Sequence, residues 1–374
     1  MNLTKPLLID SPPEKWNFED LPSYRVSQIQ QWIFEKGALH FEEMSNLPAN
    51  LRKRLQEEYD LNPMEIAREQ GSVDTTQKFL WKLRDHQFIE SVLIPATEGT
   101  KGVRASRLTL CVSTQVGCAL GCKFCASGLD GLKRNLTTGE ILGQIILARK
   151  KAGRRIDNLV FMGMGEPLAN LPALLPALDQ ILSPDGLGIG ARHITLSTSG
   201  LVPKILELAK YPAQIRLAIS LHGGDDVTRR KIMPINDRYP MDELLGACEK
   251  FIEMRKKMIT LEYILIKDIN DDVSQAKLLA EHARRLNAKV NLIPYNRVEG
   301  LEWQRPSQEK ILAFKKTVAE GNPPRVTLRM EKGHDIDAAC GQLRLREKKS
   351  EAHPSPGASG GCGGETPRAF TIVE

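Results

Sequence analysis

The sequence predicts an α/β protein with a partial (β/α) barrel, preceded by a small helical domain and followed by a disordered tail. From about residue 107 onward, short apolar runs alternate with longer amphipathic stretches, which is typical of βα units and a parallel sheet. Residues 21–61 instead follow a helical period. Residues 347–374 are too polar and too rich in glycine to form a core, so we expect disorder there.

Length and composition limit the class of protein. The 374 residues, 41% of them hydrophobic, suffice for one large domain and a small one. A net charge of +6 allows contact with nucleic acid without requiring it. No apolar stretch of about 18 residues and no secretory signal pattern occur, so we expect a cytoplasmic protein with no membrane partner.

Two elements precede the barrel in this interpretation. Residues 1–70 form the helical accessory domain, in which Ile29, Trp32 and Ile33 share one helical face. Residues 71–103 form a connector, because the strand-like runs KFLWKL and QFIESVLIP are separated by a short polar turn, as in a β-hairpin.

The barrel core is assigned to residues 104–337. Its first helix has clear boundaries, with a possible capping box at Thr137 and Glu140 and a terminating Gly153. In barrels of this kind, functional groups lie at the C-terminal ends of the strands. The predicted strands, in order, are LTLCVS, NLVFMG, HITLST, IRLAIS, ITLEYILI, KVNLIP and RVTLRM.

Three cysteines follow the first of these strands as C-x-x-x-C-x-x-C, at Cys118, Cys122 and Cys125. Random placement of the seven cysteines would give these offsets roughly 0.002 times per chain. Such a group in a reducing compartment indicates a metal site. A zinc site would need a fourth ligand, and no paired candidate follows. Three thiolates instead favour a 4Fe–4S cluster with one iron open to a small ligand.

These residues resemble the radical S-adenosylmethionine superfamily, in which the cofactor chelates the open iron. Phe124, just before the third cysteine, fits the loop of that superfamily. One βα unit later, GMGEPL offers Gly165 for close backbone approach and Glu166 as an acceptor for an ammonium group. Taken alone, GMGEPL could be an ordinary turn with a capping carboxylate.

More polar residues end the following strands. Each alone would be read as a polar strand terminus, but together they predict the rim of one cavity. We assign these residues as a group to the carboxylate, ribose and adenine of S-adenosylmethionine, with no single residue matched to a single part of the cofactor. They are Ser197, Ser220, Leu221, His222 and Asn296.

Two cysteines outside the loop narrow the resemblance. Cys111 lies on the strand before it, and Cys340 follows the last strand in DIDAACGQLR. With GMGEPL, STSG, SLH, PINDRYP and NLIPYN, residues 90–346 resemble the RlmN/Cfr family of RNA adenine methyltransferases, closer to RlmN. The resemblance implies methylation of adenine C2 in the peptidyl-transferase region of 23S rRNA and in tRNA beside the anticodon.

The resemblance also implies the site residues. Residues 338–346 carry Cys340, which takes a methyl group as S-methylcysteine; a 5′-deoxyadenosyl radical then activates that methyl group for addition to adenine. Cys111 resolves the adduct through a transient disulfide with Cys340. Glu90 is the proton acceptor, although an outward-facing strand carboxylate is the alternative. Cys248 is expected to be a small apolar residue in the packing of its helix, and Cys362 is given no role.

The implied cofactors are one 4Fe–4S cluster per subunit and two molecules of S-adenosylmethionine per turnover. The implied partners are 23S rRNA, tRNA and an electron donor such as flavodoxin or ferredoxin, and we expect a monomer. Residues 133–135 and 229–231 are either a basic RNA-binding rim or solvated charges. Two other functions stay open: adenine C8 methylation, as in Cfr-type antibiotic resistance, and an iron–sulfur redox or sensor protein.

Overall fold

The computed structural model describes residues 5–16, 18–96, 107–321, 326–329 and 332–343. The predicted tail, with Cys362, lies outside these ranges. The helical region contains α1 (Ser23–Gln30), which continues into a π-helical turn, and α2 (Ala49–Glu58). Ile29 and Ile33 are buried as predicted, and Trp32 is half-buried.

An antiparallel unit follows, made of β1 (Met64–Gly71), β2 (Gln77–Leu83) and β3 (Phe88–Pro95). The predicted hairpin corresponds to β2 and β3. β1 lies almost wholly within residues 1–70, so the expectation of a purely helical domain there is wrong. This edge strand exposes most of its side chains, so it has few apolar residues to signal its presence.

Seven parallel strands continue the same sheet beyond β3, each matching a predicted run. Their spatial order follows the chain, and β1 and β12 are the two edges, so the barrel is partial, as predicted. The strands are β4 (Leu108–Cys111), β7 (Asn158–Phe161), β8 (Ile194–Thr198), β9 (Arg216–Ser220), β10 (Thr260–Leu265), β11 (Lys289–Pro294) and β12 (Val326–Leu328).

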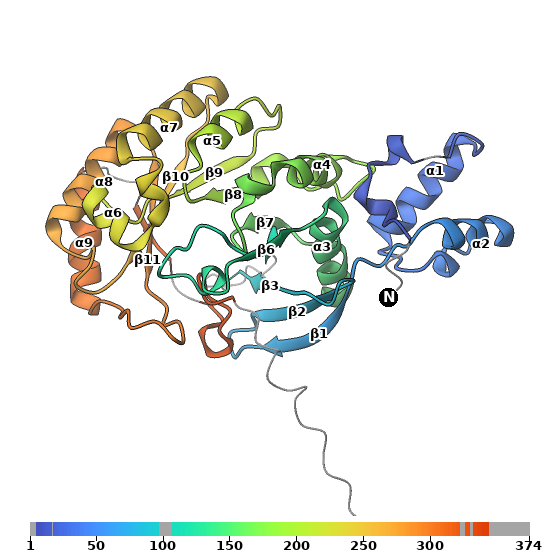
Figure 1. Cartoon of the computed structure of the whole chain (residues 1–374), viewed down its shortest axis with the longest axis horizontal. Coiled ribbons are helices and arrows are strands. Elements are labelled where there is room, and N and C mark those ends of the chain that lie inside the picture. Colours follow the sequence, from blue (N-terminus) through green and yellow to red (C-terminus); the bar gives the residue numbers. More distant parts are fainter. Residues whose placement is uncertain (1–4, 17, 97–106, 322–325, 330–331, 344–374) are drawn as a thin grey trace, which may run out of the picture. The chain divides into compact units, whose positions relative to one another are not determined.

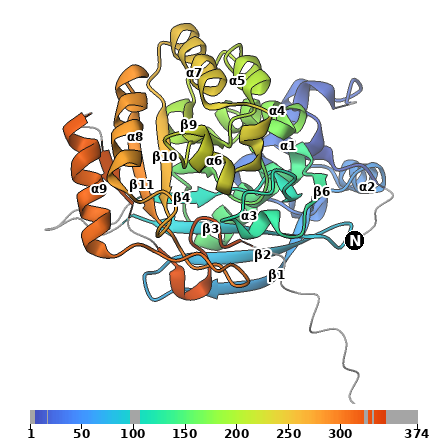
Figure 2. The ribbon, with the colours of Figure 1, turned by 60° about the vertical axis from the view of Figure 1, so that its left-hand side comes forward.

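Helices alternate with these strands along the chain and flank the sheet (Figures 1 and 2). The first of them has the predicted capping box at Thr137 and Glu140 and ends at Gly153 in the left-handed conformation. No helix in the described ranges is long and apolar enough to span a membrane. The helices are α3 (Thr138–Ala152), α4 (Leu171–Leu182), α5 (Val202–Leu208), α6 (Asp226–Ile232), α7 (Met241–Arg255), α8 (Val273–Arg285) and α9 (Gln308–Gly321).

The segment 332–343 joins the antiparallel strands to the cysteine loop. At one end, the Gly333 N–H donates to Asp74 Oδ2 at 2.8 Å, in the turn between β1 and β2. At the other end, the Gly341 carbonyl accepts from the Ala126 N–H at 2.7 Å, directly after the third cysteine of the loop. These contacts place Cys340 beside that loop.

Candidate active site

The cysteine loop is closed at its base by two short strands, β5 (Gln115–Gly117) and β6 (Leu132–Asn135), which pair antiparallel. The Cys118 N–H donates to the Gly131 carbonyl oxygen at 3.2 Å. Gly117 has a φ of +77°, and a Cβ there would lie 1.9 Å from the same oxygen. Only glycine fits at this point, which fixes where the loop begins.

Cys118, Cys122 and Cys125 line one cavity. Burial raises the pKa of the Cys118 thiol to about 12 and raises those of Cys122 and Cys125 as well, with neighbouring thiols adding to the shift. Unligated, these thiols are therefore protonated at neutral pH, and a metal must displace their protons to bind.

The three cysteines are the candidate ligands of a metal group. Among the described residues, no His, Cys, Asp and Glu side chains form a ready-made site for a single metal ion. Three thiols around one cavity are instead suited to a multi-iron cluster that occupies the space between them. Cys118, Cys122 and Cys125 would hold it and leave one iron without a protein ligand.

The wall opposite the cysteines comes from the C-terminal ends of successive parallel strands, as predicted. Gly165, Glu166, Ser197, Ser220 and His222 all line the cavity. Ser199, Glu262 and Ile264 also line it and were not anticipated.

Glu166 is buried in this wall at 3% exposure, and its oxygens accept the Ser199 N–H at 2.8 Å and the Leu168 N–H at 3.1 Å. Burial raises its pKa, against the opposing effect of these hydrogen bonds. A bound cation would offset the cost of ionising this carboxyl group. The site is therefore suited to an ammonium group, such as the amino group of S-adenosylmethionine.

His222 forms an uncharged part of the same wall. Its Nδ1 accepts the Ile264 N–H at 3.0 Å, and burial, followed by the charge of Arg229, lowers its pKa to about 3. Phe124 packs edge-on against it, with ring centroids 4.8 Å apart. The aromatic residue of the cysteine loop thus contacts the cofactor wall.

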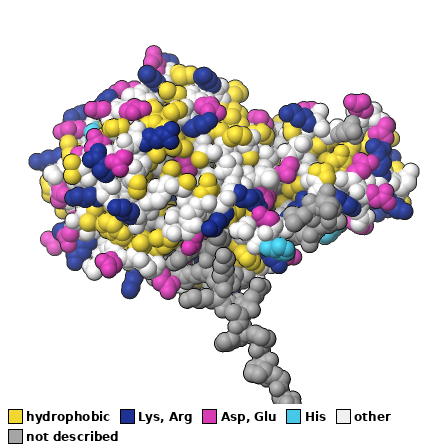
Figure 3. Space-filling model, viewed as in Figure 1, with side chains coloured by type: hydrophobic (Ala, Val, Ile, Leu, Met, Phe, Trp, Pro, Cys, Tyr) yellow, Lys and Arg dark blue, Asp and Glu magenta, His cyan; other side chains and the backbone are white. Residues whose placement is uncertain are grey.

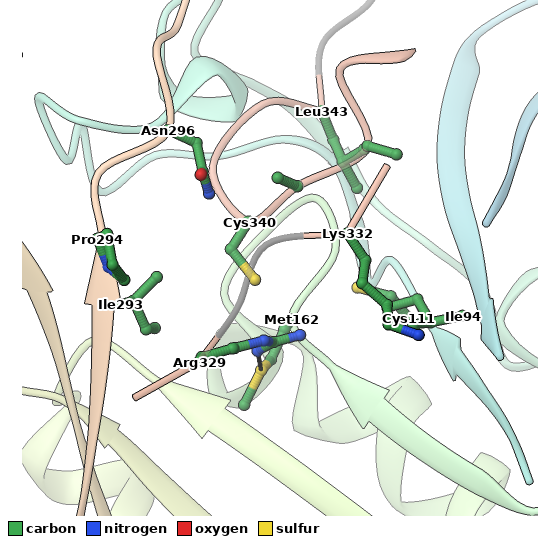
Figure 4. A pocket seen from close by; sticks show the side chains of 12 residues that line it. Ile94, Cys111, Met162, Ile293, Pro294, Asn296, Arg329, Lys332, Cys340 and Leu343 are labelled. Carbon is green, nitrogen blue, oxygen red and sulfur yellow. Dashed lines mark hydrogen bonds between the residues drawn. The ribbon is translucent and has the colours of Figure 1, made fainter. Parts of the chain in front are cut away.

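A second cavity adjoins the first, because Cys340, Met162 and Ile293 line both. Cys111 lines the second cavity, so the structure brings together the two cysteines that the sequence separates by most of the barrel. Figure 4 shows the Cys340 side chain pointing into this cavity, toward the side where Arg329 and Met162 lie.

Cys111 and Cys340 are both free thiols in this structure, so the predicted disulfide is not formed and a transient one stays a prediction. Burial raises the pKa of Cys111 to about 12, and a thiolate at Cys340 would add to the rise. Arg329 opposes this effect with a nearby positive charge, and it was missed although it lies at the end of the predicted strand RVTLRM and directly follows β12. The rule that strand ends carry function would have found it.

Glu90 lies on β3, buried at 5% exposure, but it lines neither of the two cavities. Its Oε1 is 3.3 Å from Lys78 Nζ on β2, and both side chains are almost completely buried. Lys78 Nζ also donates to the Asp337 carbonyl at 3.4 Å, three residues before Cys340. Sequence reasoning missed this lysine, which connects Glu90 to the segment that carries Cys340.

Several predicted residues lie elsewhere. Leu221 is fully buried and its side chain does not line the cofactor cavity, while Asn296 lines the second cavity instead. Cys248 is buried in α7, as its assignment to helix packing requires.

Both alternatives for the basic run, an RNA-binding rim and solvated charges, are wrong for Arg229, which is 0% exposed because it lies on the inward face of α6. Arg134 is engaged in ion pairs with Asp85 and Glu140, and Arg230 in one with Asp237. On the face shown in Figure 3, Lys and Arg side chains are interspersed with Asp and Glu.

Two family models match the chain. The radical SAM superfamily matches residues 112–277, and the ribosomal RNA large subunit methyltransferase N-terminal domain matches residues 19–61. These matches cover the cysteine loop with its cofactor wall and the helical region, respectively.

Whole-chain comparisons agree. The chain is 55% identical over 329 residues to a probable dual-specificity RNA methyltransferase RlmN from Akkermansia muciniphila, covering 88% of this chain and 91% of that protein. A probable dual-specificity RNA methyltransferase RlmN 3 from Opitutus terrae is 51% identical over 338 residues, covering 88% and 90%. The crystal structure of a radical SAM methyltransferase from Sphaerobacter thermophilus aligns with a TM-score of 0.85 at 40% identity, covering 91% of this chain and 99% of that one.

Proposed function

Because the chain belongs to the RlmN family of radical SAM RNA methyltransferases, we propose that it methylates adenine C2 in 23S rRNA and in tRNA. The observation that carries the proposal is the position of Cys340, which lines both the cavity of the cysteine loop and the cavity of Cys111. A group carried on its sulfur can be reached from both.

Adenine C2 requires unusual chemistry, because this carbon is electron-poor and its hydrogen is not acidic. When bound, a 4Fe–4S cluster and S-adenosylmethionine supply the one-electron chemistry that such a carbon needs. We assign the cluster to Cys118, Cys122 and Cys125 and the amino group of the cofactor to Glu166.

The remaining steps belong to three side chains. Cys340 accepts the methyl group that later joins the RNA, forming a sulfur–carbon bond as the sulfonium bond breaks. Glu90, held by Lys78, takes the proton from C2. Together with that proton the adduct must give up its unpaired electron, which would return to the bound cluster. The Cys111 thiolate then attacks the Cys340 sulfur, the electron pair of the broken sulfur–carbon bond goes to the carbon released with the RNA, and that carbon takes up a proton to become the methyl group.

Partners follow from this chemistry. An external low-potential electron donor such as flavodoxin or ferredoxin must reduce the protein, and a thiol reductant must reopen the Cys111–Cys340 disulfide. The target base has to leave its RNA fold to reach buried groups, so we expect base extrusion. We propose a monomer acting in the cytoplasm, where both RNA substrates are found.

The test is methylation of ribosomal RNA and tRNA by anaerobically reconstituted protein, with modified adenosines identified by mass spectrometry. We expect C2-methyladenosine from the wild type and none from Cys340→Ala. Cys111→Ala should accumulate an RNA crosslink through Cys340. Cys248→Ala is the matched control, because this cysteine is buried outside both cavities, and it should retain turnover.

Full activity of Cys340→Ala would falsify the proposal. A C8-methylated product would instead assign the chain a Cfr-type activity. Absence of S-adenosylmethionine cleavage by the reduced protein would leave only a redox or sensor role for the cluster.

A further inference from the structure

Arg229 is a fully buried guanidinium behind the wall of the cofactor cavity. From α6, its Nε donates to the Leu221 carbonyl at 3.0 Å, Nη1 to Asn236 Oδ1 at 2.9 Å and Nη2 to the Ser199 carbonyl at 2.6 Å. One side chain thus joins the loops that follow β8 and β9 to a third segment. A lysine could not span these acceptors, because it lacks the planar fork of donors.

The guanidinium carries a positive charge that these acceptors do not neutralise, since all three are neutral oxygens. Burial lowers the pKa of Arg229 to about 10, which still leaves it protonated at neutral pH. The carboxylate of Asp226 is one hydrogen bond away, since its Oδ1 accepts from Asn236 Nδ2 at 2.8 Å. A buried charge of this kind is costly unless a negative group lies near.

With a cluster bound, the thiolates of the cysteine loop would supply that negative group. The Lys123 N–H, directly after Cys122, donates to the carbonyl of Ile232 at the end of α6 at 2.9 Å. Ser199 and Cys122 line the same cavity, and the Ser199 carbonyl accepts from Arg229 Nη2. The guanidinium therefore lies directly behind a residue of the wall of the cavity that the three cysteines line.

The close packing of α6 depends on a glycine. A Cβ at Gly223 would lie 2.7 Å from the Arg229 backbone nitrogen and Cα, so only glycine lets the loop after β9 pass this helix. The SLHGG sequence therefore fixes the guanidinium behind the cavity wall, where it cannot swing into solvent.

We infer that Arg229 is a positioning residue that places a fixed positive charge behind the wall of the cavity that Cys122 lines, and so favours the reduced state of the cluster. This inference rests on the proposed function, because it requires the cluster at the three cysteines. Uptake of one electron from an external low-potential donor adds one negative charge to the cluster and its thiolates. A fixed cation in a region of low dielectric stabilises the added charge, which raises the reduction potential.

The test is the midpoint potential of the reconstituted full-length protein, measured by a reductive titration monitored by electron paramagnetic resonance without RNA or cofactor. Arg229→Met removes the charge and should lower the equilibrium constant for reduction at least tenfold, about 59 mV for one electron. Arg229→Lys keeps the positive charge, so its midpoint potential should stay close to that of the wild type. Arg230→Met is the matched control, because this exposed neighbour pairs with Asp237, and it should change nothing.

An unchanged potential in Arg229→Met, with full iron and sulfide content, contradicts the inference. A shift in Arg229→Lys as large as that in Arg229→Met also contradicts it, since loop distortion would then be the cause. If Arg229→Met assembles no cluster, the midpoint potential of Asn236→Asp tests the inference instead. A carboxylate against Nη1 compensates the positive charge of Arg229 and must lower that potential. A wild-type protein that assembles no cluster contradicts the proposed function itself.

Discussion

Replacing Gly117 with alanine should disrupt the cysteine loop far more than the same replacement at Gly121. Both glycines have positive φ, at +77° and +61°, so alanine costs roughly 1–2 kcal/mol of backbone strain at either position. The positions differ in space: a Cβ at Gly117 lies 1.9 Å from the Gly131 oxygen, whereas at Gly121 no atom lies within 4 Å.

The Gly131 oxygen would have to move by about 1 Å to reach even the 3.0 Å closest approach, because the Cβ lies at 1.9 Å. That movement breaks its hydrogen bond with the Cys118 N–H, which contributes about 1 kcal/mol and leaves a buried donor without its partner. We therefore expect a loss of about 3 kcal/mol in the free energy of unfolding for Gly117→Ala, against the strain of about 1–2 kcal/mol alone for Gly121→Ala.

Urea unfolding of the metal-free protein measures both losses, and iron content after reconstitution measures the consequence for the cluster. We expect Gly117→Ala to lose most of its iron and Gly121→Ala to keep it. Equal destabilisation by the two substitutions would refute the close contact at Gly117 as the reason for this glycine.

Two further predictions concern buried charges. Lys78→Met should lower the free energy of unfolding in urea by about 3 kcal/mol, because Glu90 loses its buried lysine partner. Lys82→Met on the same strand is the control and should cost under about 1 kcal/mol, since its pair with Glu65 is exposed. Similar losses in the two variants would show that the buried pair is unimportant for stability. Glu166→Gln should weaken S-adenosylmethionine binding at least tenfold, as measured by calorimetry. The affinity of the wild type should fall as the pH falls, because burial raises the pKa of the Glu166 carboxyl group and its protonated form cannot balance a cation. Unchanged affinity would remove Glu166 from the cofactor site.

The barrel strands could be predicted because buried parallel strands appear as apolar runs. All seven runs became strands in their predicted order, and the polar residues that end β7, β8 and β9 line one cavity. The three-cysteine spacing predicted one loop with three thiols, and the structure places all three around one cavity. These features are local, so sequence spacing suffices to find them.

The features that were missed depend on long-range packing. Cys340 was named through the resemblance, but the contacts that place its segment, such as Gly333 with Asp74, were not predicted, because no local pattern encodes them. Arg229 lies in a run of three basic residues and was assigned to the surface, but it shares the buried face of α6 with Thr228 and Ile232. Lys78 lies among apolar residues of β2, where its pairing with Glu90 depends on strand register.

The central claim is that the methyl group passes through Cys340, and a single-turnover labelling experiment tests it most directly. Protein whose Cys340 carries a trideuterated methyl group is mixed with RNA and unlabelled S-adenosylmethionine under reducing conditions. We predict that the first methyladenosine formed retains two of the deuterium atoms, since one is abstracted before the carbon adds to C2. An unlabelled first product, with the deuterated methyl group still on Cys340, would contradict the account.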